Sequence, residues 1–234
     1  MKILKKIAKF IIKNCENILY ELSTFLPYPF RIKYSLTQRP AYAYCLYHSA
    51  KLAKKLGLNK ISVIEFGVAS GNGLRYLEIA SKKVEKLVGI KIEIYGFDNV
   101  DGLPKPLDYR DLPYHWKSGF FKMDKARLDA VLNRSQIIVG NIEDTSKTFF
   151  DEYNPAPIGA VFHDFDFYSS TKIALNLFKA NNENFLPRVF NYFDDTIGIE
   201  TELYNDFTGE RLAIKEFNNK NKDIKFSPAY HLIC

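Results

Sequence analysis

Short apolar runs alternate with amphipathic stretches over most of the chain. Five runs rich in branched aliphatic and aromatic residues predict buried strands. The predicted strands cover residues 61–64, 92–97, 136–139, 158–162 and 189–193. Because stretches with helical spacing separate them, the pattern predicts an α/β fold, with a mostly parallel central sheet and helices on both faces.

The helices between these strands are predicted from apolar residues at helical spacing. Asp124 is a predicted N-cap, and Gly57 ends the helix that precedes the first strand. A final strand is predicted at residues 224–233. The predicted helices cover residues 41–56, 74–86, 125–132 and 146–153, one that begins near residue 169, and one around residues 212–217.

Residues 1–24 predict one amphipathic helix ahead of this pattern, with lysines mostly on its polar side. Pro27 and Pro29 end it. One interpretation packs the helix on the domain or on a second subunit of a homo-oligomer, and the other docks it on an anionic membrane surface. We therefore divide the chain into an N-terminal helix and loop (1–40) and a single domain (41–234). The apolar positions are Leu4, Ile7, Ile11, Cys15, Ile18 and Leu22.

Composition is that of a soluble globular protein, with 47% hydrophobic and 26% charged residues among 234. The net charge is +6, but five lysines lie in the first 13 residues, so the remainder argues only weakly for a nucleic-acid partner. The three cysteines lie far apart without metal-ligand spacing, which favours reduced thiols in a cytoplasmic protein. No apolar run reaches the ~20 residues of a membrane span.

A glycine-rich turn follows the first predicted strand, in the sequence KISVIEFGVASGNGLRYL (60–77). Such a strand–turn–helix brings backbone N–H groups close to a ligand. The order E-x-G-x-x-x-G-x-G differs from the dinucleotide fingerprint, because Tyr76 stands where a third glycine would fall. It resembles the first motif of class I S-adenosylmethionine (SAM) methyltransferases, in which the acid that matches Glu65 lies near the ammonium end of SAM. The structural alternative is a plain strand–helix turn.

Acidic residues stand at the carboxyl ends of the predicted strands, where ligands of parallel sheets bind. Asp98 follows the second strand and is the expected partner of ribose hydroxyls, with a turn-forming role as the alternative. Asp164, Asp194 and Asp195 follow the fourth and fifth strands. Carboxylates that converge repel one another unless they bind a cation, and oxygen ligands favour Mg²⁺. Helix capping is the alternative for these acids, most of all for Asp166.

The stretch 99–123 is a long predicted loop, rich in proline, glycine and aromatic residues. Loops of this length inside a compact domain are usually lids or binding loops. We expect it to cover the substrate, with His115 and Trp116 among its aromatic neighbours.

Four segments together resemble the macrocin O-methyltransferase family. Residues 95–104 (YGFDNVDGLP) resemble its F-D-S-F-E-G-L-P stretch, and 140–145 (GNIEDT) resemble its G-x-F-x-D-T segment. Residues 164–171 (DFDFYSST) are similar to D-x-D-x-Y-x-S-T, and Asp194-Asp195 match its D-D pair. The segments stand in the family's order. Asn141, Phe165 and Thr196 depart from it, as do the first 40 residues and the tail beyond about 200.

The resemblance implies a Rossmann-like class I methyltransferase fold, and the apolar pattern of residues 1–24 adds an N-terminal helical extension to it. The resemblance also implies a Mg²⁺-dependent SAM O-methyltransferase of natural-product biosynthesis, acting on a hydroxyl of a sugar or similar polyhydroxylated molecule. Asp164 and His115 are the candidate bases, and His163 is a weaker one. The implied metal ligands are Asp164, Asp194 and Asp195. The implied SAM-binding residues are Glu65, Gly67, Ser70, Gly71, Asp98, Asn141, Asp144 and Asp164.

Three alternatives remain open on the sequence alone. A metal-independent methyltransferase would use the same fold. An NAD-linked reductase would need a third glycine and a Tyr/Lys pair near the fifth strand, which the sequence does not show. A non-catalytic SAM-binding or membrane-associated accessory protein is disfavoured by the intact acid cluster but is compatible with the basic helix.

Overall fold

The computed structural model describes residues 21–198 and 204–229. Its centre is a sheet of five parallel strands in the order β3-β2-β1-β4-β5, which confirms the predicted α/β architecture. β1 and β4 are almost wholly buried because helices cover both faces, which explains their continuous apolar runs. The strands are β1 (Lys60–Phe66), β2 (Lys91–Asp98), β3 (Ser135–Val139), β4 (Ile158–His163) and β5 (Phe185–Phe193).

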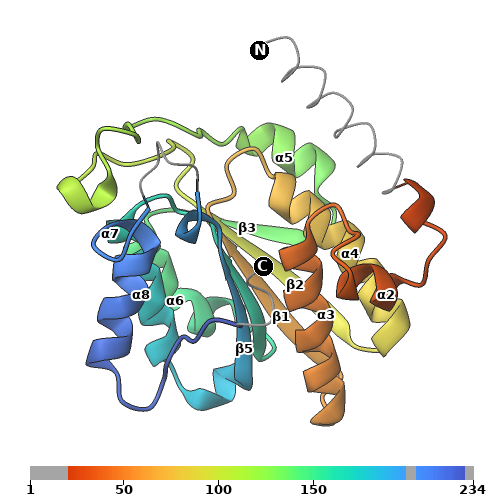
Figure 1. The fold of residues 1–234 in the computed structure, drawn as a ribbon. Coiled ribbons are helices and arrows are strands. Elements are labelled where there is room, and N and C mark those ends of the chain that lie inside the picture. Colours follow the sequence, from red (N-terminus) through yellow and green to blue (C-terminus); the bar gives the residue numbers. More distant parts are fainter. Residues whose placement is uncertain (1–20, 199–203, 230–234) are drawn as a thin grey trace, which may run out of the picture.

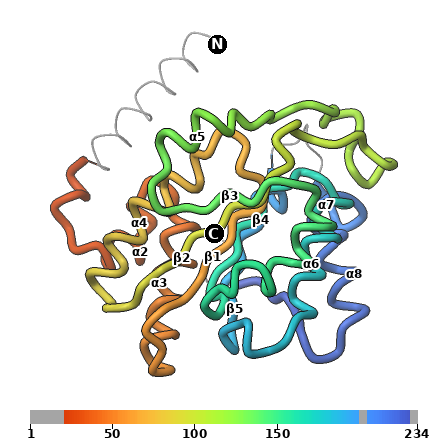
Figure 2. Tube along the Cα trace, turned by 180° about the vertical axis from the view of Figure 1, so that it is seen from behind, coloured from red at the N-terminus to blue at the C-terminus, as the bar shows by residue number. Residues whose placement is uncertain are grey.

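Helices lie in two layers on opposite sides of the sheet (Figures 1 and 2). One layer holds α2 (Tyr28–Lys33), α3 (Pro40–Lys55) and α4 (Asn72–Val88). The other holds α6 (Ile142–Tyr153), α7 (Tyr168–Ala174) and α8 (Gly209–Lys220). α5 (Lys125–Val131) joins the first layer through Leu128. The short 3-10 helices are η1 (Tyr109–Asp111), η2 (Leu175–Lys179), η3 (Asn182–Asn184) and η4 (Asp194–Thr196).

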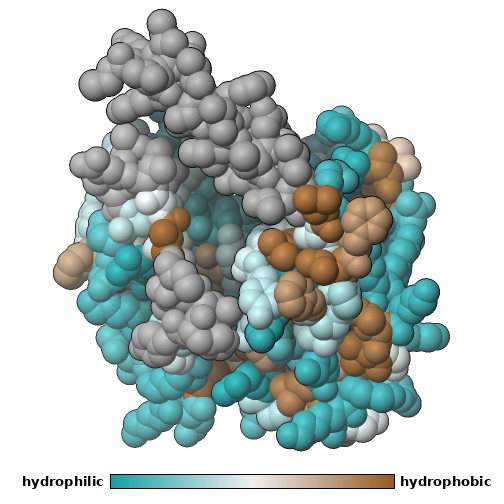
Figure 3. Space-filling model, turned by 45° about the vertical axis from the view of Figure 1, so that its right-hand side comes forward, coloured by the Kyte–Doolittle hydropathy of each residue, from teal (hydrophilic) through white to brown (hydrophobic). Residues whose placement is uncertain are grey.

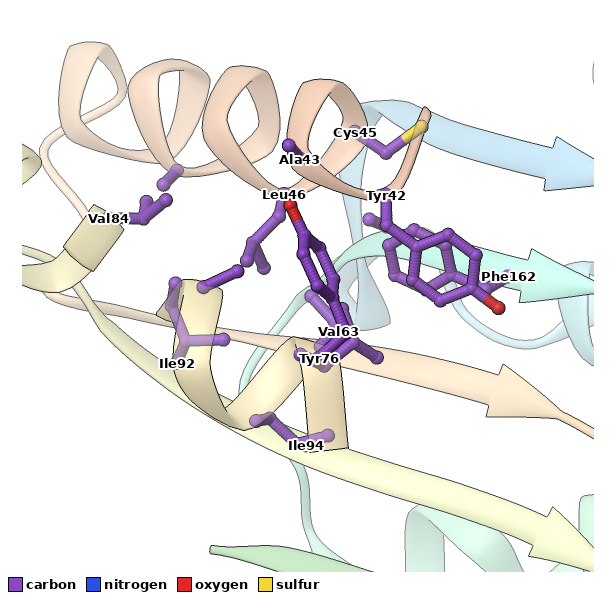
Figure 4. Close-up of a cluster of buried hydrophobic side chains, with 14 of the residues drawn as sticks. Tyr42, Ala43, Cys45, Leu46, Val63, Tyr76, Val84, Ile92, Ile94 and Phe162 are labelled. Carbon is purple, nitrogen blue, oxygen red and sulfur yellow. The ribbon is translucent and has the colours of Figure 1, made fainter. Parts of the chain in front are cut away.

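Each layer buries its own hydrophobic core against the sheet. In the core under α3 and α4, Leu46 and Val63 are fully buried and the Tyr42 ring stacks on Phe162 at 4.3 Å (Figure 4). In the core under α6–α8, Phe149 packs edge-on against Phe97. These two cores fix the sheet, and with it the loops at its carboxyl edge.

Several predicted boundaries shift in the structure. The loop expected after Pro27 contains the short helix α2, with Pro29 in its first turn. β5 begins at Phe185, earlier than predicted, and α6 begins at Ile142, because Asn141 caps it by accepting the Glu143 N–H. Residues 224–229 form no strand, and the rest of the predicted final strand lies outside the described residues. Most of the predicted N-terminal helix also lies outside them.

The surface carries a mixed pattern, with hydrophobic side chains in small groups among hydrophilic ones on the face that Figure 3 presents. Phe25 and Leu22 are the most exposed hydrophobic residues near α2, at 87% and 60%. Within the described part of the chain, no helix has both the length and the apolarity that crossing a membrane requires.

Candidate functional site

A large pocket opens at the carboxyl edge of the sheet, with a volume of about 1100 Å³. It lies where the strand order reverses between β1 and β4, the usual ligand position in open parallel sheets. The glycine loop after β1, the acids after β2, β4 and β5, and the loop 99–123 all line it. The pocket therefore joins the segments that the sequence singled out.

Two glycines shape the floor of the pocket by leaving room for other groups. Gly67 has φ +82°, and a Cβ there would overlap the backbone carbonyl oxygen of Asp164. Gly73, in the first turn of α4, faces the Glu65 carboxylate, and a Cβ there would overlap Oε1. The glycine spacing is thus explained by close approach of β4 and of a buried acid.

Glu65 is the buried acid at the end of β1, with 2% of its surface exposed. Tyr42 donates a hydrogen bond from its hydroxyl to Glu65 Oε1 at 2.8 Å, while Oε2 is buried without a hydrogen-bond partner among the described residues. Burial raises the pKa of Glu65 to about 8, against the lowering effects of Tyr42 and Arg39. A buried, half-satisfied carboxylate at a pocket wall suits a cationic ligand group.

Asp98 holds the glycine loop in place. Its Oδ2 accepts the backbone N–H groups of Val68 and Ala69 at 2.9 and 2.8 Å, and its Oδ1 accepts that of Val100 at 2.9 Å. A carboxylate has about four acceptor positions, so room for one further hydrogen bond remains. The hydrogen bonds that Asp98 accepts from backbone N–H groups agree with the turn-forming alternative. Because Asp98 also lines the pocket, it can still accept a hydrogen bond from a ribose hydroxyl.

Asp164, Asp194 and Asp195 line the same side of the pocket, as the strand ends predicted. Burial raises the pKa of Asp164 to about 7, with repulsion from Asp194 and Asp195 as the next causes. Burial and the charge of Asp195 also raise the pKa of Asp166 to about 9. Asp164 and Asp166 are therefore not both fully charged at neutral pH without a cation.

Asp195 is tied into the protein from several sides. Its Oδ2 accepts the backbone N–H of Asp166 at 3.0 Å, and its Oδ1 accepts the Tyr204 hydroxyl at 2.6 Å. Its own N–H donates to the fully buried Glu210 on α8 at 3.0 Å. Asp194 is exposed and accepts a hydrogen bond from Tyr192. The two adjacent acids thus differ, because one is anchored and the other faces the open pocket.

Within residues 21–198 and 204–229, no group of three or more His, Cys, Asp or Glu side chains is arranged closely enough to hold a metal ion. The donor chemistry nevertheless fits a hard cation, since oxygen ligands from Asp164 and Asp194 share one pocket wall and their charges repel. Both side-chain oxygens of Asp195 already accept hydrogen bonds from the protein. Asp195 therefore suits a role in positioning its neighbours at least as well as a role as a metal ligand.

The loop 99–123 is attached to the domain rather than free. The buried carboxylate of Asp111 accepts the backbone N–H and hydroxyl of Ser169 in α7 at 2.8 and 3.0 Å. Its Oδ2 also accepts the Leu107 N–H at 2.9 Å. Figure 1 shows this loop in yellow-green, running over the top of the molecule towards α7. Trp116 and Phe121 of the loop line the pocket, with ring centroids 5.6 Å apart.

Most predicted site residues meet in the pocket, but three do not line it. Gly71 begins α4 with φ +75° and faces Leu128, and Asp144 is exposed on α6. His115 packs edge-on against Trp116, so the structure does not bring this candidate base to the acids. The residues brought together are Glu65, Gly67, Ser70, Asp98, Asn141, Asp164, Asp166, Asp194 and Asp195.

His163 does not belong to the pocket lining. It is the fully buried last residue of β4, where Nε2 lies 3.2 Å from Asn191 Oδ1 on β5 and the ring stacks on Phe193 at 4.1 Å. Burial lowers its pKa to about 3. The ring therefore has a packing role, and this weaker base candidate lies outside the pocket lining.

The pocket residues that the sequence analysis did not assign include one at the start of α3 and one at the end of β5. Arg39 and Tyr192 both line the pocket, and Tyr42 contacts Glu65 behind it. A topological signal was present for Arg39. A helix that leads into a parallel strand runs antiparallel to it, so the first residues of the helix reach the carboxyl edge.

The sheet order, the glycine loop and the pocket at the switch point define the class: the chain has the Rossmann-like class I methyltransferase fold. A comparison with solved structures finds a similar fold in CalS11, a calicheamicin methyltransferase. The two sequences are 18% identical and the structures superpose with a TM-score of 0.53, over 88% of this chain and 84% of CalS11.

Two further solved structures were matched at lower TM-scores. An apo form of CalS11, described as a TDP-rhamnose 3'-O-methyltransferase, is 17% identical with a TM-score of 0.46, over 93% and 90% of the two chains. The O-methyltransferase NovP is 13% identical with a TM-score of 0.42, over 60% of each chain. No family model and no curated protein matches the sequence.

Proposed function

We propose that the chain is a SAM-dependent O-methyltransferase, Mg²⁺-dependent, that acts on a hydroxyl of a sugar or a similar polyhydroxylated small molecule. One observation carries the proposal. A single pocket on a class I methyltransferase fold joins the glycine loop and buried Glu65 to a wall of mutually repelling carboxyl groups. The first part suits the cofactor, and the second suits the chemistry at an acceptor hydroxyl.

The cofactor would lie along the carboxyl ends of β1 and β2. Glu65 would accept the ammonium group, Gly67 and Ser70 would let the backbone approach the methionine part, and Asp98 would accept a ribose hydroxyl through its remaining acceptor position. Asn141, which lines the pocket after β3, would lie near the adenine.

The metal would be held by Asp164 and Asp194, with Asp195 as a third ligand or as a support for the other two. When bound, SAM supplies a methyl group on a positively charged sulfur, and Mg²⁺ lowers the pKa of a hydroxyl that it binds. The chain's own carboxylates would orient the acceptor hydroxyl, and their oxygen ligands suit a hard cation such as Mg²⁺.

Asp164 is the base that the geometry favours, because it lines the pocket at the end of β4, whereas His115 does not. The acceptor O–H gives its proton to Asp164 Oδ as the new O–CH₃ bond forms. The C–S bond breaks with its electron pair going to sulfur, which leaves S-adenosylhomocysteine (SAH). His115 would need the loop to move before it reached the acceptor.

The acceptor class rests on the sequence resemblance and on the aromatic wall of the pocket. Trp116 and Phe121 offer flat faces of the kind that pack on sugar rings, and the Trp116 indole N–H is buried without a partner among the described residues. CalS11 is described as acting on TDP-rhamnose, which makes nucleotide sugars a sensible first panel.

A methyl-transfer assay tests the proposal. Purified protein is incubated with methyl-labelled SAM and a panel of nucleotide sugars, free glycosides and catechols, with Mg²⁺ or with EDTA. We expect labelled product from a sugar acceptor, lost in EDTA and reduced at least a hundredfold in Asp164→Asn. Product that survives EDTA would instead support the metal-independent alternative. No product from any acceptor would contradict the enzyme proposal.

A further inference from the structure

Arg39 is a cation placed at the wall of the acidic pocket by the start of α3. It is the N-cap residue, directly before Pro40, and its carbonyl accepts the Ala43 N–H at 3.0 Å. Its side chain is half-buried and lines the pocket beside Glu65 and Tyr192. The helix start therefore fixes where the guanidinium lies.

The guanidinium rests on an aromatic ring instead of pairing with an acid. Its central carbon lies 4.9 Å from the centroid of the Tyr42 ring. No ion pair to Arg39 is formed by any acid in the described ranges, although its charge lowers the pKa of both Glu65 and Asp164. An arginine held this way keeps its five N–H donors for a planar anion such as a carboxylate.

Tyr42 connects this cation to the buried acid. Its ring lies under the Arg39 guanidinium and its hydroxyl donates to Glu65 Oε1, so one side chain holds both a cation and a buried acid. The ring is itself fixed by stacking on Phe162 (Figure 4). A fixed cation, together with an acid that a bound ammonium group would ionise, matches the carboxylate and ammonium groups that an α-amino acid carries on one carbon.

We propose that Arg39 binds the α-carboxylate at the amino-acid end of SAM while Glu65 binds the ammonium group. This inference rests on the proposed function, because it assigns a specificity residue within the same cofactor site. Arg39 is then what distinguishes the complete cofactor from an adenosine thioether that lacks the amino-acid end.

Two ligands isolate this contact: SAH and 5'-methylthioadenosine, which shares the adenosine and the sulfur but has no amino-acid end. Binding is measured by calorimetry for the wild type, Arg39→Gln and Arg39→Lys. We expect Arg39→Gln to weaken SAH about ten- to a hundredfold and methylthioadenosine less than twofold. Arg39→Lys, which keeps the charge but loses the planar fork, should fall between. Lys105→Ala is the matched control, because Lys105 is an exposed pocket cation on the loop.

The outcomes separate the possible roles. Equal weakening of both ligands in Arg39→Gln would mean a structural role and would overturn the inference. Unchanged SAH affinity with a raised KM for an anionic acceptor would overturn it too, and would assign Arg39 to the acceptor. If Lys105→Ala weakened SAH binding as much as Arg39→Gln does, the effect would come from the overall positive charge of the pocket, and the specific contact with Arg39 would be ruled out. If the wild type binds neither ligand, the proposed function itself fails, which is distinguishable from failure of Arg39 alone.

Discussion

Glu65 has almost no exposed surface, yet it forms the base of a pocket built from polar groups. Burying a carboxylate is costly unless it is neutral or paired, and here only one oxygen receives a hydrogen bond within the described residues. Burial of Glu65 therefore lowers the stability of the ligand-free protein, and a bound ammonium group would offset that loss of stability.

Replacing Glu65 by Gln should remove a pH dependence of stability. The pKa of Glu65 is raised from 4.5 to about 8 in the folded protein, so the folded state holds this proton more tightly than the unfolded state does. Its stabilising contribution is full below about pH 4.5 and is lost as the pH rises through 8. We expect wild-type stability, measured by urea unfolding, to decline relative to Glu65→Gln between pH 5 and pH 8 by on the order of a few kcal/mol. The exposed Glu152→Gln should show no such divergence, and parallel curves for wild type and Glu65→Gln would contradict the account.

Gly73→Ala should destabilise the protein by about 1–3 kcal/mol and weaken SAH binding, because the added methyl overlaps Glu65 Oε1. The Tyr42 hydrogen bond holds that carboxylate, so it cannot simply swing away. Urea unfolding measures the cost. In a Glu65→Ala background the same change should cost much less, and simple additivity of the two substitutions would show that the overlap is not the cause.

At the residue level, the sequence predicted which acids reach the pocket but not how each is used. Strand ends are legible in sequence, so Asp98, Asp164 and the Asp194–Asp195 pair were found. Their hydrogen bonds cannot be predicted from the sequence, because all but one of the donors to Asp98 and Asp195 come from residues 9 to 30 positions away. His115 failed to reach the acids because loop conformation, unlike strand order, has no periodic signal.

At the scale of elements, the loop 99–123 is held at both its base and its tip. Met123 donates its N–H to the Val100 carbonyl at 3.0 Å, and Asp111 joins the tip to α7. Val100 has φ +71°, an unusual conformation for a β-branched residue. If the loop closes over substrate, the part that moves would therefore be the segments between these two attachments.

Asp111→Ala should cost about 1–3 kcal/mol of stability, since it leaves Ser169 and Leu107 N–H groups without their acceptor. It should also make the loop a faster site of limited proteolysis. Asp129→Ala is the control, because it removes an exposed i,i+4 pair with Lys125 and should cost only about 0.5 kcal/mol. Equal effects of the two substitutions would show that Asp111 does not anchor the loop.

Helices and strands with strong periodicity were predicted well, including α3, α5 with its Asp124 cap, and all five strands. Short elements were not. α2 has six residues, too few to show a helical period. The two prolines near its start were interpreted as a helix break, whereas in the structure they stand at the beginning of a short helix. The N-terminal helix, its membrane or subunit contact and homo-oligomer formation remain predictions from the sequence.

At the scale of the whole molecule, a chain of net charge +6 places eight of its 27 acidic residues around one pocket at the carboxyl edge of the sheet. That concentration opposes folding through mutual repulsion, and it is the electrostatic basis of the proposed Mg²⁺ site. Within the pocket lining, Arg39 and Lys105 are the only basic side chains described, and neither forms an ion pair with the acids.

Mg²⁺ should therefore stabilise the protein without its cofactor. At a concentration of 100 times Kd we expect a rise in Tm of about 5–10 °C, from ~2.7 kcal/mol of binding free energy. Asp194→Asn should melt higher than the wild type in EDTA, because repulsion is relieved, and should lose the response to Mg²⁺. NaCl at matched ionic strength is the control. A Tm that does not respond to Mg²⁺ in the wild type would contradict metal binding by the apoprotein.

Calorimetric titration of SAH into the purified protein shows whether the pocket binds SAM. NADH serves as the control ligand, because dinucleotides also bind to Rossmann-like folds. We expect micromolar SAH binding that is lost in Glu65→Gln, with no signal from NADH. If SAH gave no heat of binding, or if NADH bound in its place, the glycine loop would not be a SAM site and the methyltransferase proposal would be contradicted.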